Sequence, residues 1–91
     1  MHGEYKVPGG KLIVVDLHIG NGIFNKVQIS GDFFLNPPEA LDYINQSFEG
    51  LPINISNMIL KKIIESTLPI ETEFLGFQIS DILETIRKIL K

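Results

Sequence analysis

The sequence contains no cysteine. This absence excludes disulfides, thiolate metal sites and thiol nucleophiles, and it suits a reducing cytoplasm, where we expect the protein to reside. No apolar run approaches the ~20 residues that span a bilayer. The first residues also lack the basic and then apolar order of a secretion signal. We therefore expect no membrane segment, in a chain that is complete as written.

Positively charged residues are few and scattered. Eight Lys and Arg stand against eleven Asp and Glu, which gives a net charge of −3 at pH 7. A general nucleic-acid-binding protein needs a dense basic stripe to displace counterions from the phosphates. The charge pattern therefore argues against a nucleic-acid partner.

The composition that remains is that of a small globular domain. The chain has 91 residues, of which 44% are hydrophobic and 21% charged, so it can form one domain, residues 1–91, with a single core. Apolar residues recur at helical spacing in three later segments, which predict helices that begin near Asn36, Ser56 and Ser80. The segment Ile70–Phe77 remains open between a charged loop and a packed segment.

The first third of the chain predicts three strands, at Glu4–Val7, Lys11–Ile19 and Ile23–Ser30. Between the first two strands, Gly9 and Gly10 follow a proline. We interpret them as a turn rather than a phosphate-binding loop, because a strand and not a helix comes next. The order of elements predicts an α+β fold, a three-stranded antiparallel meander followed by three helices packed on the sheet.

The apolar residues of the second and third strands predict their register. A three-residue loop, residues 20–22, sets apolar residues opposite each other: Ile13 with Ile29, Val15 with Val27 and Ile19 with Ile23. It also sets Asp16 opposite Lys26 and predicts a left-handed backbone conformation at Gly22.

This register leaves a second apolar face on the sheet. Its members are Leu12, Val14, Phe24 and, if the strand continues, Phe34. Such a face is too apolar to lie wholly in water, so either the protein's own helices or a partner protein must cover it.

Candidate catalytic residues are few. Asp16 and His18 point to the same face of their strand, as a base-catalytic pair would. We favour a structural role, in which Asp16 pairs with Lys26 and His18 covers Phe24, because no nucleophile is near in sequence. His2 is close to a terminus that we expect to be mobile. No cluster of His, Asp and Glu has the spacing of a metal site.

The most distinctive local pattern is Ile29–Phe34, where a strand reaches Gly31 and Asp32 and then presents two adjacent phenylalanines. Gly31 permits a bulge or a close approach of another backbone segment. Asp32 can accept hydrogen bonds from backbone amides of the turn into Phe33, and the same corner can contact a partner; the two roles are compatible.

Three segments together resemble the small accessory domain of lipoate–protein ligases. They are Lys6–Leu12, Val27–Phe34 and the helix start Pro38–Leu41, with a Gly-Asn-Gly hairpin loop between the first two. The resemblance covers most of the chain and is most specific from Ile29 to Phe34. In some archaea and bacteria this domain is a separate polypeptide, so the resemblance implies a separate subunit of a bipartite ligase.

The resemblance implies an accessory role. Lipoate–protein ligases activate lipoate with ATP to lipoyl-AMP and then transfer the lipoyl group to a lysine of an acceptor protein. The family's large domain holds lipoate, ATP and magnesium, so we expect this chain alone to bind none of them and to have no activity. The implied partner is the catalytic subunit. The lipoyl acceptor domains of 2-oxoacid dehydrogenases and the glycine cleavage H protein are indirect partners.

The residues expected at the interface with the catalytic subunit come from the glycine turn, the apolar sheet face and the Asp-Phe-Phe corner: Gly9, Gly10, Lys11, Leu12, Val14, Phe24, Gly31, Asp32, Phe33 and Phe34. Lys11 could approach the nucleotide phosphates, although the glycine pattern before it is a weak signal. Two alternatives remain open: a stand-alone adaptor or scaffold with no ligase role, and a small enzyme that uses Asp16 and His18.

Overall fold

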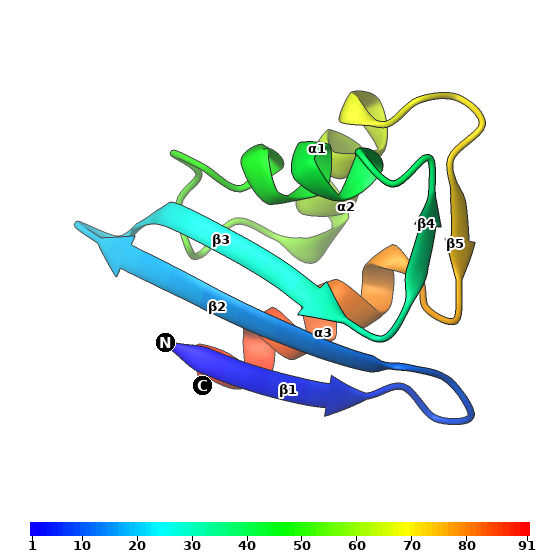
Figure 1. Cartoon of the computed structure of the whole chain (residues 1–91). Coiled ribbons are helices and arrows are strands. Elements are labelled where there is room, and N and C mark those ends of the chain that lie inside the picture. The colour runs from blue at the N-terminus through cyan, green and yellow to red at the C-terminus, as the bar shows by residue number, and fades with distance from the viewer.

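The computed structural model describes residues 1–91 and shows an α+β fold (Figure 1). The main sheet is antiparallel, in the order β1 (His2–Lys6), β2 (Leu12–Gly20) and β3 (Ile23–Gly31). The helices are α1 (Ala40–Ser47), α2 (Asn57–Thr67) and α3 (Ile79–Ile89). The predicted fold class, a three-stranded antiparallel meander followed by three helices, is confirmed. None of the helices combines the length and the apolar character that crossing a bilayer requires.

A second sheet, which the sequence does not predict, has two strands. β4 (Phe34–Asn36) follows soon after β3, and β5 (Glu73–Leu75) pairs with it antiparallel. In Figure 1 this ribbon rises from the C-terminal end of β3 towards the start of α1. The segment 70–77 therefore contains a strand, and its Phe74 and Phe77 pack against the core or within it.

The β2–β3 hairpin has a different register from the predicted one. Its loop has two residues, Asn21 and Gly22, with φ of 55° and 75°, so the left-handed conformation of Gly22 is confirmed. A register shift next to the loop then restores the match between apolar residues. The observed pairs on the core side are Val15 with Ile29 and Leu17 with Val27. The predicted pairs, Ile13 with Ile29, Val15 with Val27 and Ile19 with Ile23, are therefore wrong, because a regular ladder with a longer loop is replaced by a short loop and a bulge.

The bulge also moves Phe24 into the core. His18 lies opposite residue 26 and Ile19 opposite residue 24, so Asn25 is the extra residue of β3. Phe24 is fully buried, and its ring meets the ring of Phe48 edge to face with centroids 5.6 Å apart. The predicted position of Phe24 on the opposite, solvent-facing side of the sheet is wrong.

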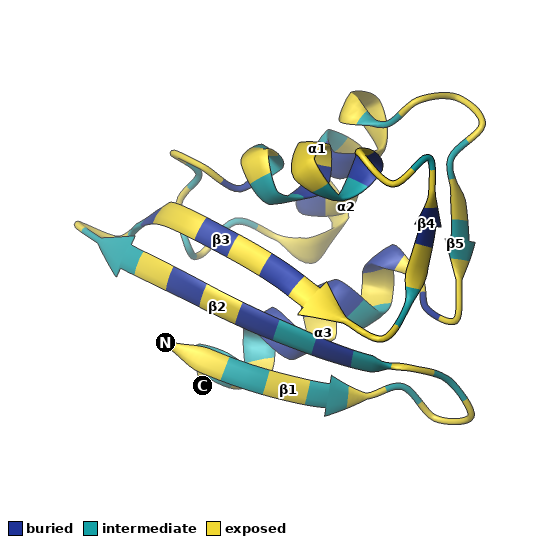
Figure 2. Cartoon of the chain, in the orientation of Figure 1, coloured by how far each residue is buried: buried dark blue, intermediate teal, exposed yellow.

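The core lies between one face of the main sheet and the helices. Seventeen buried apolar residues form one cluster, drawn from β2, β3, β4, the helices and the segments that flank them (Figure 2). α3 packs on β1 and β2, whereas α1 packs on β3. Gly3 permits this close packing, because a Cβ at that position would overlap the side chain of Ile89. In Figure 1 α3 runs behind the sheet, which leaves the opposite face uncovered.

Two of the three helices begin with other caps than the predicted ones. Ser56 caps α2 as predicted, because its hydroxyl accepts a hydrogen bond from a first-turn amide at 3.2 Å. α1 has Glu39 as its N-cap, and Asn36 instead precedes a cis proline. α3 has Gln78 in a capping box rather than Ser80. The helices themselves lie where the apolar spacing predicts them.

Candidate functional site

Reciprocal contacts between the start of β2 and the end of β3 hold the predicted interface corner. The Leu12 amide donates a hydrogen bond to Asp32 Oδ1 at 2.6 Å, and the Asp32 amide donates to the Leu12 carbonyl at 3.3 Å. Gly31 has φ of 151°, and a Cβ on it would overlap the Leu12 carbonyl oxygen. The predicted close backbone approach at Gly31 is confirmed. The expected partner of Asp32 is wrong, since it accepts a cross-strand amide rather than an amide of the turn into Phe33.

The glycine turn between β1 and β2 lies against the segment that follows β5. Gly9 has φ of 67°, and the Gly10 amide donates to the Val7 carbonyl at 2.8 Å, which is the pattern of a type II turn. The next amide, of Lys11, donates to the Gly76 carbonyl at 3.3 Å. Lys11 therefore links two parts of the site. Its own amide contacts Gly76, and the next residue, Leu12, makes the contacts with Asp32.

A hollow of about 390 Å³ separates this turn from the first turn of α3. The first turn is already capped: the Asp81 carboxylate accepts a hydrogen bond from the Gln78 amide at 2.8 Å. The N-terminal end of a helix carries a partial positive charge that can attract an anion, and here the Asp81 carboxylate already occupies that position. The hollow is thus a poor phosphate site. No group of three or more His, Asp or Glu side chains is arranged to hold a metal ion.

The two phenylalanines of the corner lie in different environments. Phe33 is half-buried, and its ring centroid lies 4.2 Å from that of Phe77, which in turn stacks on Phe74 at 5.3 Å. Phe34 is 66% exposed. Phe33 therefore holds the β5 segment against the end of the main sheet, whereas Phe34 is available to a partner.

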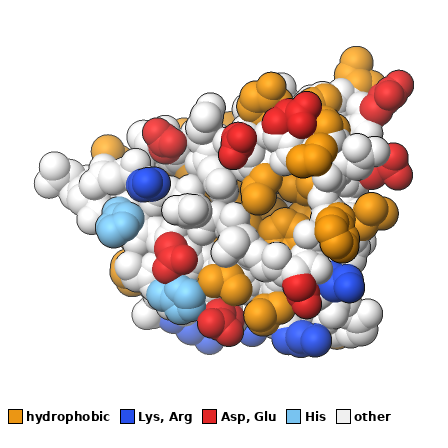
Figure 3. Space-filling model, in the orientation of Figure 1, with side chains coloured by type: hydrophobic (Ala, Val, Ile, Leu, Met, Phe, Trp, Pro, Cys, Tyr) orange, Lys and Arg blue, Asp and Glu red, His pale blue; other side chains and the backbone are white.

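An exposed apolar surface surrounds Phe34. Leu75 lies directly opposite Phe34 in the ribbon and is 50% exposed. A hollow of about 190 Å³ adjoins Phe34 and is lined also by Pro38 and Leu41 at the start of α1. Figure 3 shows apolar side chains gathered over this part of the molecule. Sequence reasoning does not find Leu75, because a three-residue strand is too short to show a period.

The open face of the main sheet is more polar than predicted. Leu12 and Val14 lie on it and are half-buried, but Phe24 is in the core. Figure 3 shows histidine and acidic side chains across much of this face. The open face therefore offers two neighbouring apolar side chains rather than the broad apolar surface that the sequence suggests.

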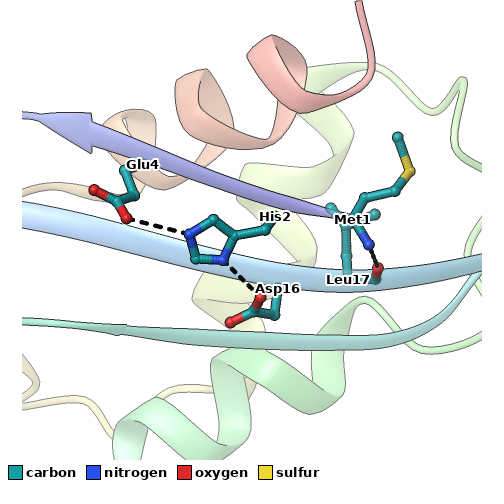
Figure 4. A network of polar contacts seen from close by, with 5 residues as sticks. All are labelled: Met1, His2, Glu4, Asp16 and Leu17. Carbon is teal, nitrogen blue, oxygen red and sulfur yellow. Dashed lines mark hydrogen bonds and ion pairs between the residues drawn. The ribbon is translucent and has the colours of Figure 1, made fainter.

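Asp16 and His2 form a contact that sequence reasoning does not find. His2 lies in β1, and its ring lies between two carboxylates, with Nδ1 2.7 Å from Asp16 Oδ1 and Nε2 3.2 Å from Glu4 Oε2 (Figure 4). The hydrogen bond to Asp16 and then that to Glu4 raise the pKa of His2 above its ordinary value of 6.5. The predicted pair of Asp16 and Lys26 is wrong, because the bulge sets Lys26 opposite His18. The Asp16 carboxylate bonds to His2, not to His18, which disfavours the catalytic pair.

The three-stranded meander, the helices behind it and the β4–β5 ribbon define a small α+β domain, with an exposed corner as its candidate site. Residues 2–86 match the family described as bacterial lipoate protein ligase C-terminus, and the chain belongs to this family. The resemblance seen in the sequence is thereby confirmed.

A solved structure has a similar fold. It is described as a structural analysis of an archaeal lipoylation system, a bi-partite lipoate protein ligase and its E2 lipoyl domain from Thermoplasma acidophilum. A chain of that structure superposes with a TM-score of 0.69 at 24% sequence identity, over 96% of this chain and 98% of that chain. The search of curated proteins finds no match. At this identity the likeness establishes the fold.

Proposed function

We propose that this protein is the non-catalytic accessory subunit of a two-chain lipoate–protein ligase. It docks on a catalytic subunit and enables the ATP-dependent activation of lipoate to lipoyl-AMP. The observation that carries the proposal is the family match over residues 2–86. The likeness to a chain of a structure that contains a bi-partite ligase, over 98% of that chain, supports a separate subunit.

The contacts of the carboxylates support a structural rather than a catalytic use of this chain. Asp32 accepts the Leu12 amide, Asp81 caps α3 and Asp16 accepts from His2. Carboxylates bound in this way hold backbone and strands in place. We therefore place lipoate, ATP and magnesium on the catalytic subunit.

The mechanism we propose is a shift in the conformational population of the partner. The catalytic subunit would have an open state and a state closed over lipoate and ATP, and this protein would bind the closed state more tightly. A ligand shifts such an equilibrium only by its difference in affinity for the two states. A hundredfold difference would stabilise the closed state by about 2.8 kcal/mol.

The later step belongs to the catalytic subunit in this proposal. It transfers the lipoyl group to acceptor domains of 2-oxoacid dehydrogenases and to the glycine cleavage H protein. The accessory subunit meets these acceptors only through the complex. We place the complex in the cytoplasm, in keeping with a sequence that has no cysteine.

Complex formation distinguishes this proposal from a stand-alone adaptor. The protein is mixed with the lipoate–protein ligase catalytic chain of the same organism and passed over a size-exclusion column with light-scattering detection. We expect a one-to-one complex. If the two chains elute separately at micromolar concentrations, and this protein captures other proteins in a pull-down experiment, the adaptor is favoured.

A further inference from the structure

Apolar residues around the ribbon form one contiguous surface, which we call the Phe34 surface. It consists of the exposed Phe34 and Leu75 of the ribbon, with the exposed Pro38 and the half-buried Leu41 at the start of α1. Phe34 and Leu75 are cross-strand neighbours, so their side chains leave the ribbon on the same side. Phe34 also lines the hollow that reaches Pro38 and Leu41. A single exposed apolar residue is ordinary in a protein, but a contiguous set with a hollow is typical of a binding site.

The Phe34 surface is rigidly supported from below. The neighbours of Phe34 on either side, Phe33 and Leu35, point into the protein: Phe33 stacks on Phe77, and Leu35 is buried in the core cluster. The ribbon partner Phe74 joins the same aromatic stack. A surface held in this way loses little conformational freedom on binding, which favours affinity.

The charged residues nearest to this surface in the sequence are acidic. Glu39 and Asp42 adjoin Pro38 and Leu41, Glu71 precedes β5, and Glu73 is its first residue. No Lys or Arg occurs between Lys26 and Lys61, or between Lys62 and Arg87, so the ribbon and α1 carry no basic side chain. The basic residue Lys11 lies near one end of this region, where its backbone amide donates to the carbonyl of Gly76, the residue after β5. Figure 3 shows acidic side chains beside the apolar ones on this side of the molecule.

We propose that the Phe34 surface binds an apolar segment of the ligase catalytic chain that carries lysine or arginine side chains at its borders. An apolar side chain of that segment fills the hollow between Phe34 and Leu41, and its basic side chains meet the acidic rim. Complementary charge of this kind orients the partner and speeds association. Phe34, which becomes buried in the complex, supplies a large share of the affinity. This inference rests on the proposed function, since it assigns the partner of that function to one surface.

Two variants and two matched controls test the inference by isothermal titration calorimetry with the catalytic chain. Phe34→Ala should weaken binding about tenfold or more, as expected for an aromatic residue central to an interface. Glu39→Gln combined with Glu71→Gln should weaken binding severalfold at about 50 mM salt and reduce its dependence on salt. The controls are Met58→Ala, an equally exposed apolar residue of α2, and the double variant Glu65→Gln with Glu84→Gln. They should bind like the wild type.

The outcomes separate this inference from the function on which it rests. Loss of binding in Phe34→Ala and in the Glu39 and Glu71 double variant, with folded circular dichroism spectra and normal controls, supports the inference. Suppose that the wild-type protein binds the catalytic chain and accelerates lipoyl-AMP formation. Normal binding by the Phe34→Ala variant then overturns the inference and leaves the function intact. No binding by the wild type overturns both.

Discussion

At the scale of single residues, the Asp32 carboxylate fixes the corner. It accepts the Leu12 amide at 2.6 Å, where β2 begins. Asp32→Ala removes this acceptor and should lower the free energy of unfolding by about 1 kcal/mol, the net contribution of a typical protein hydrogen bond. Urea denaturation measures the change. Asp32→Asn keeps an acceptor oxygen and should lose less stability than Asp32→Ala. Equal stability of the wild type and Asp32→Ala would refute the role of Asp32 in fixing the corner.

His2 makes the stability of the protein depend on pH. Its hydrogen bonds to Asp16 and then Glu4 raise its pKa above 6.5 in the folded state. A raised pKa means that the folded protein binds the proton more tightly than the unfolded chain does. The stabilisation is therefore complete below the unfolded pKa and is lost as the pH rises through the folded pKa.

The variant His2→Gln tests this pH dependence. It should lower the melting temperature at about pH 5.5 and have a smaller effect at about pH 8.5, because the contribution of the charged imidazole has then been lost. Thermal unfolding at both pH values measures the difference. His18→Gln is the control, since no hydrogen bond or ion pair of the His18 ring is found. An equal effect of His2→Gln at both pH values would show that the contact is not ionic.

Residue-scale prediction from sequence succeeds where the cause is local. Gly31 and Asp32 could be singled out because glycine and aspartate next to a strand end have few ordinary roles. The partner of Asp32 could not be predicted, because Leu12 lies 20 residues away on another strand. The same limit applies to His2 and Asp16, which are 14 residues apart.

At the scale of elements, the hairpin shows how far an alternating pattern can be read. β2 buries alternate residues, Ile13, Val15 and Leu17, as the alternation of side chains along a strand requires. The register of β2 against β3 differs from the predicted one. A bulge breaks the period of two, so that Phe24 and Val27 lie on one face although they are three residues apart. β5 is missed for another reason: it has only three residues, and its partner strand β4 lies on a distant part of the chain.

Arg87 of α3 secures the connection between α1 and α2. Its Nη1 donates to the Ile53 carbonyl at 2.8 Å, its Nη2 donates to the Ile55 carbonyl, and its Nε donates to Asn57 Oδ1 at 2.8 Å. A planar guanidinium presents its donors as a fixed fork that can reach acceptors on different sides, whereas the three donors of an ammonium group radiate from a single nitrogen atom. Arg87 is therefore the main polar link between this irregular segment and α3.

Arg87→Ala should destabilise the protein by about 2–3 kcal/mol, because it leaves partly buried carbonyl groups without donors. Arg87→Lys should recover only part of this loss. Lys88→Ala is the matched control: Lys88 is exposed and lies over the Tyr5 ring at 4.3 Å, a contact of about 0.5–1 kcal/mol. Chemical denaturation of the three variants gives the ranking. A loss in Arg87→Ala no larger than that in Lys88→Ala would contradict the role.

At the scale of the whole molecule, sequence order was enough for the fold class. Turn residues separate the strands, and apolar residues at helical spacing mark the helices, so an α+β meander with helices follows without tertiary information. The candidate surface was predictable only in part. Phe34 is exposed, and Pro38 and Leu41 follow it closely in the chain, but Leu75 joins them only through the pairing of β4 with β5.

The molecule as a whole separates a polar sheet face from an apolar, acid-flanked corner. In the proposed complex the corner meets the catalytic subunit, and the carboxylates of this chain take no part in the chemistry. We therefore expect this protein to change the rate of a reaction whose substrates it does not bind.

The rate of lipoyl-AMP formation by the catalytic chain, measured from ATP, magnesium and lipoate with and without this protein, tests that claim most directly. We expect little product from the catalytic chain alone, none from this protein alone, and at least a tenfold faster rate from the mixture, equivalent to about 1.4 kcal/mol of the activation barrier. Equal rates with and without this protein, at concentrations where the two chains form a complex, would contradict the account.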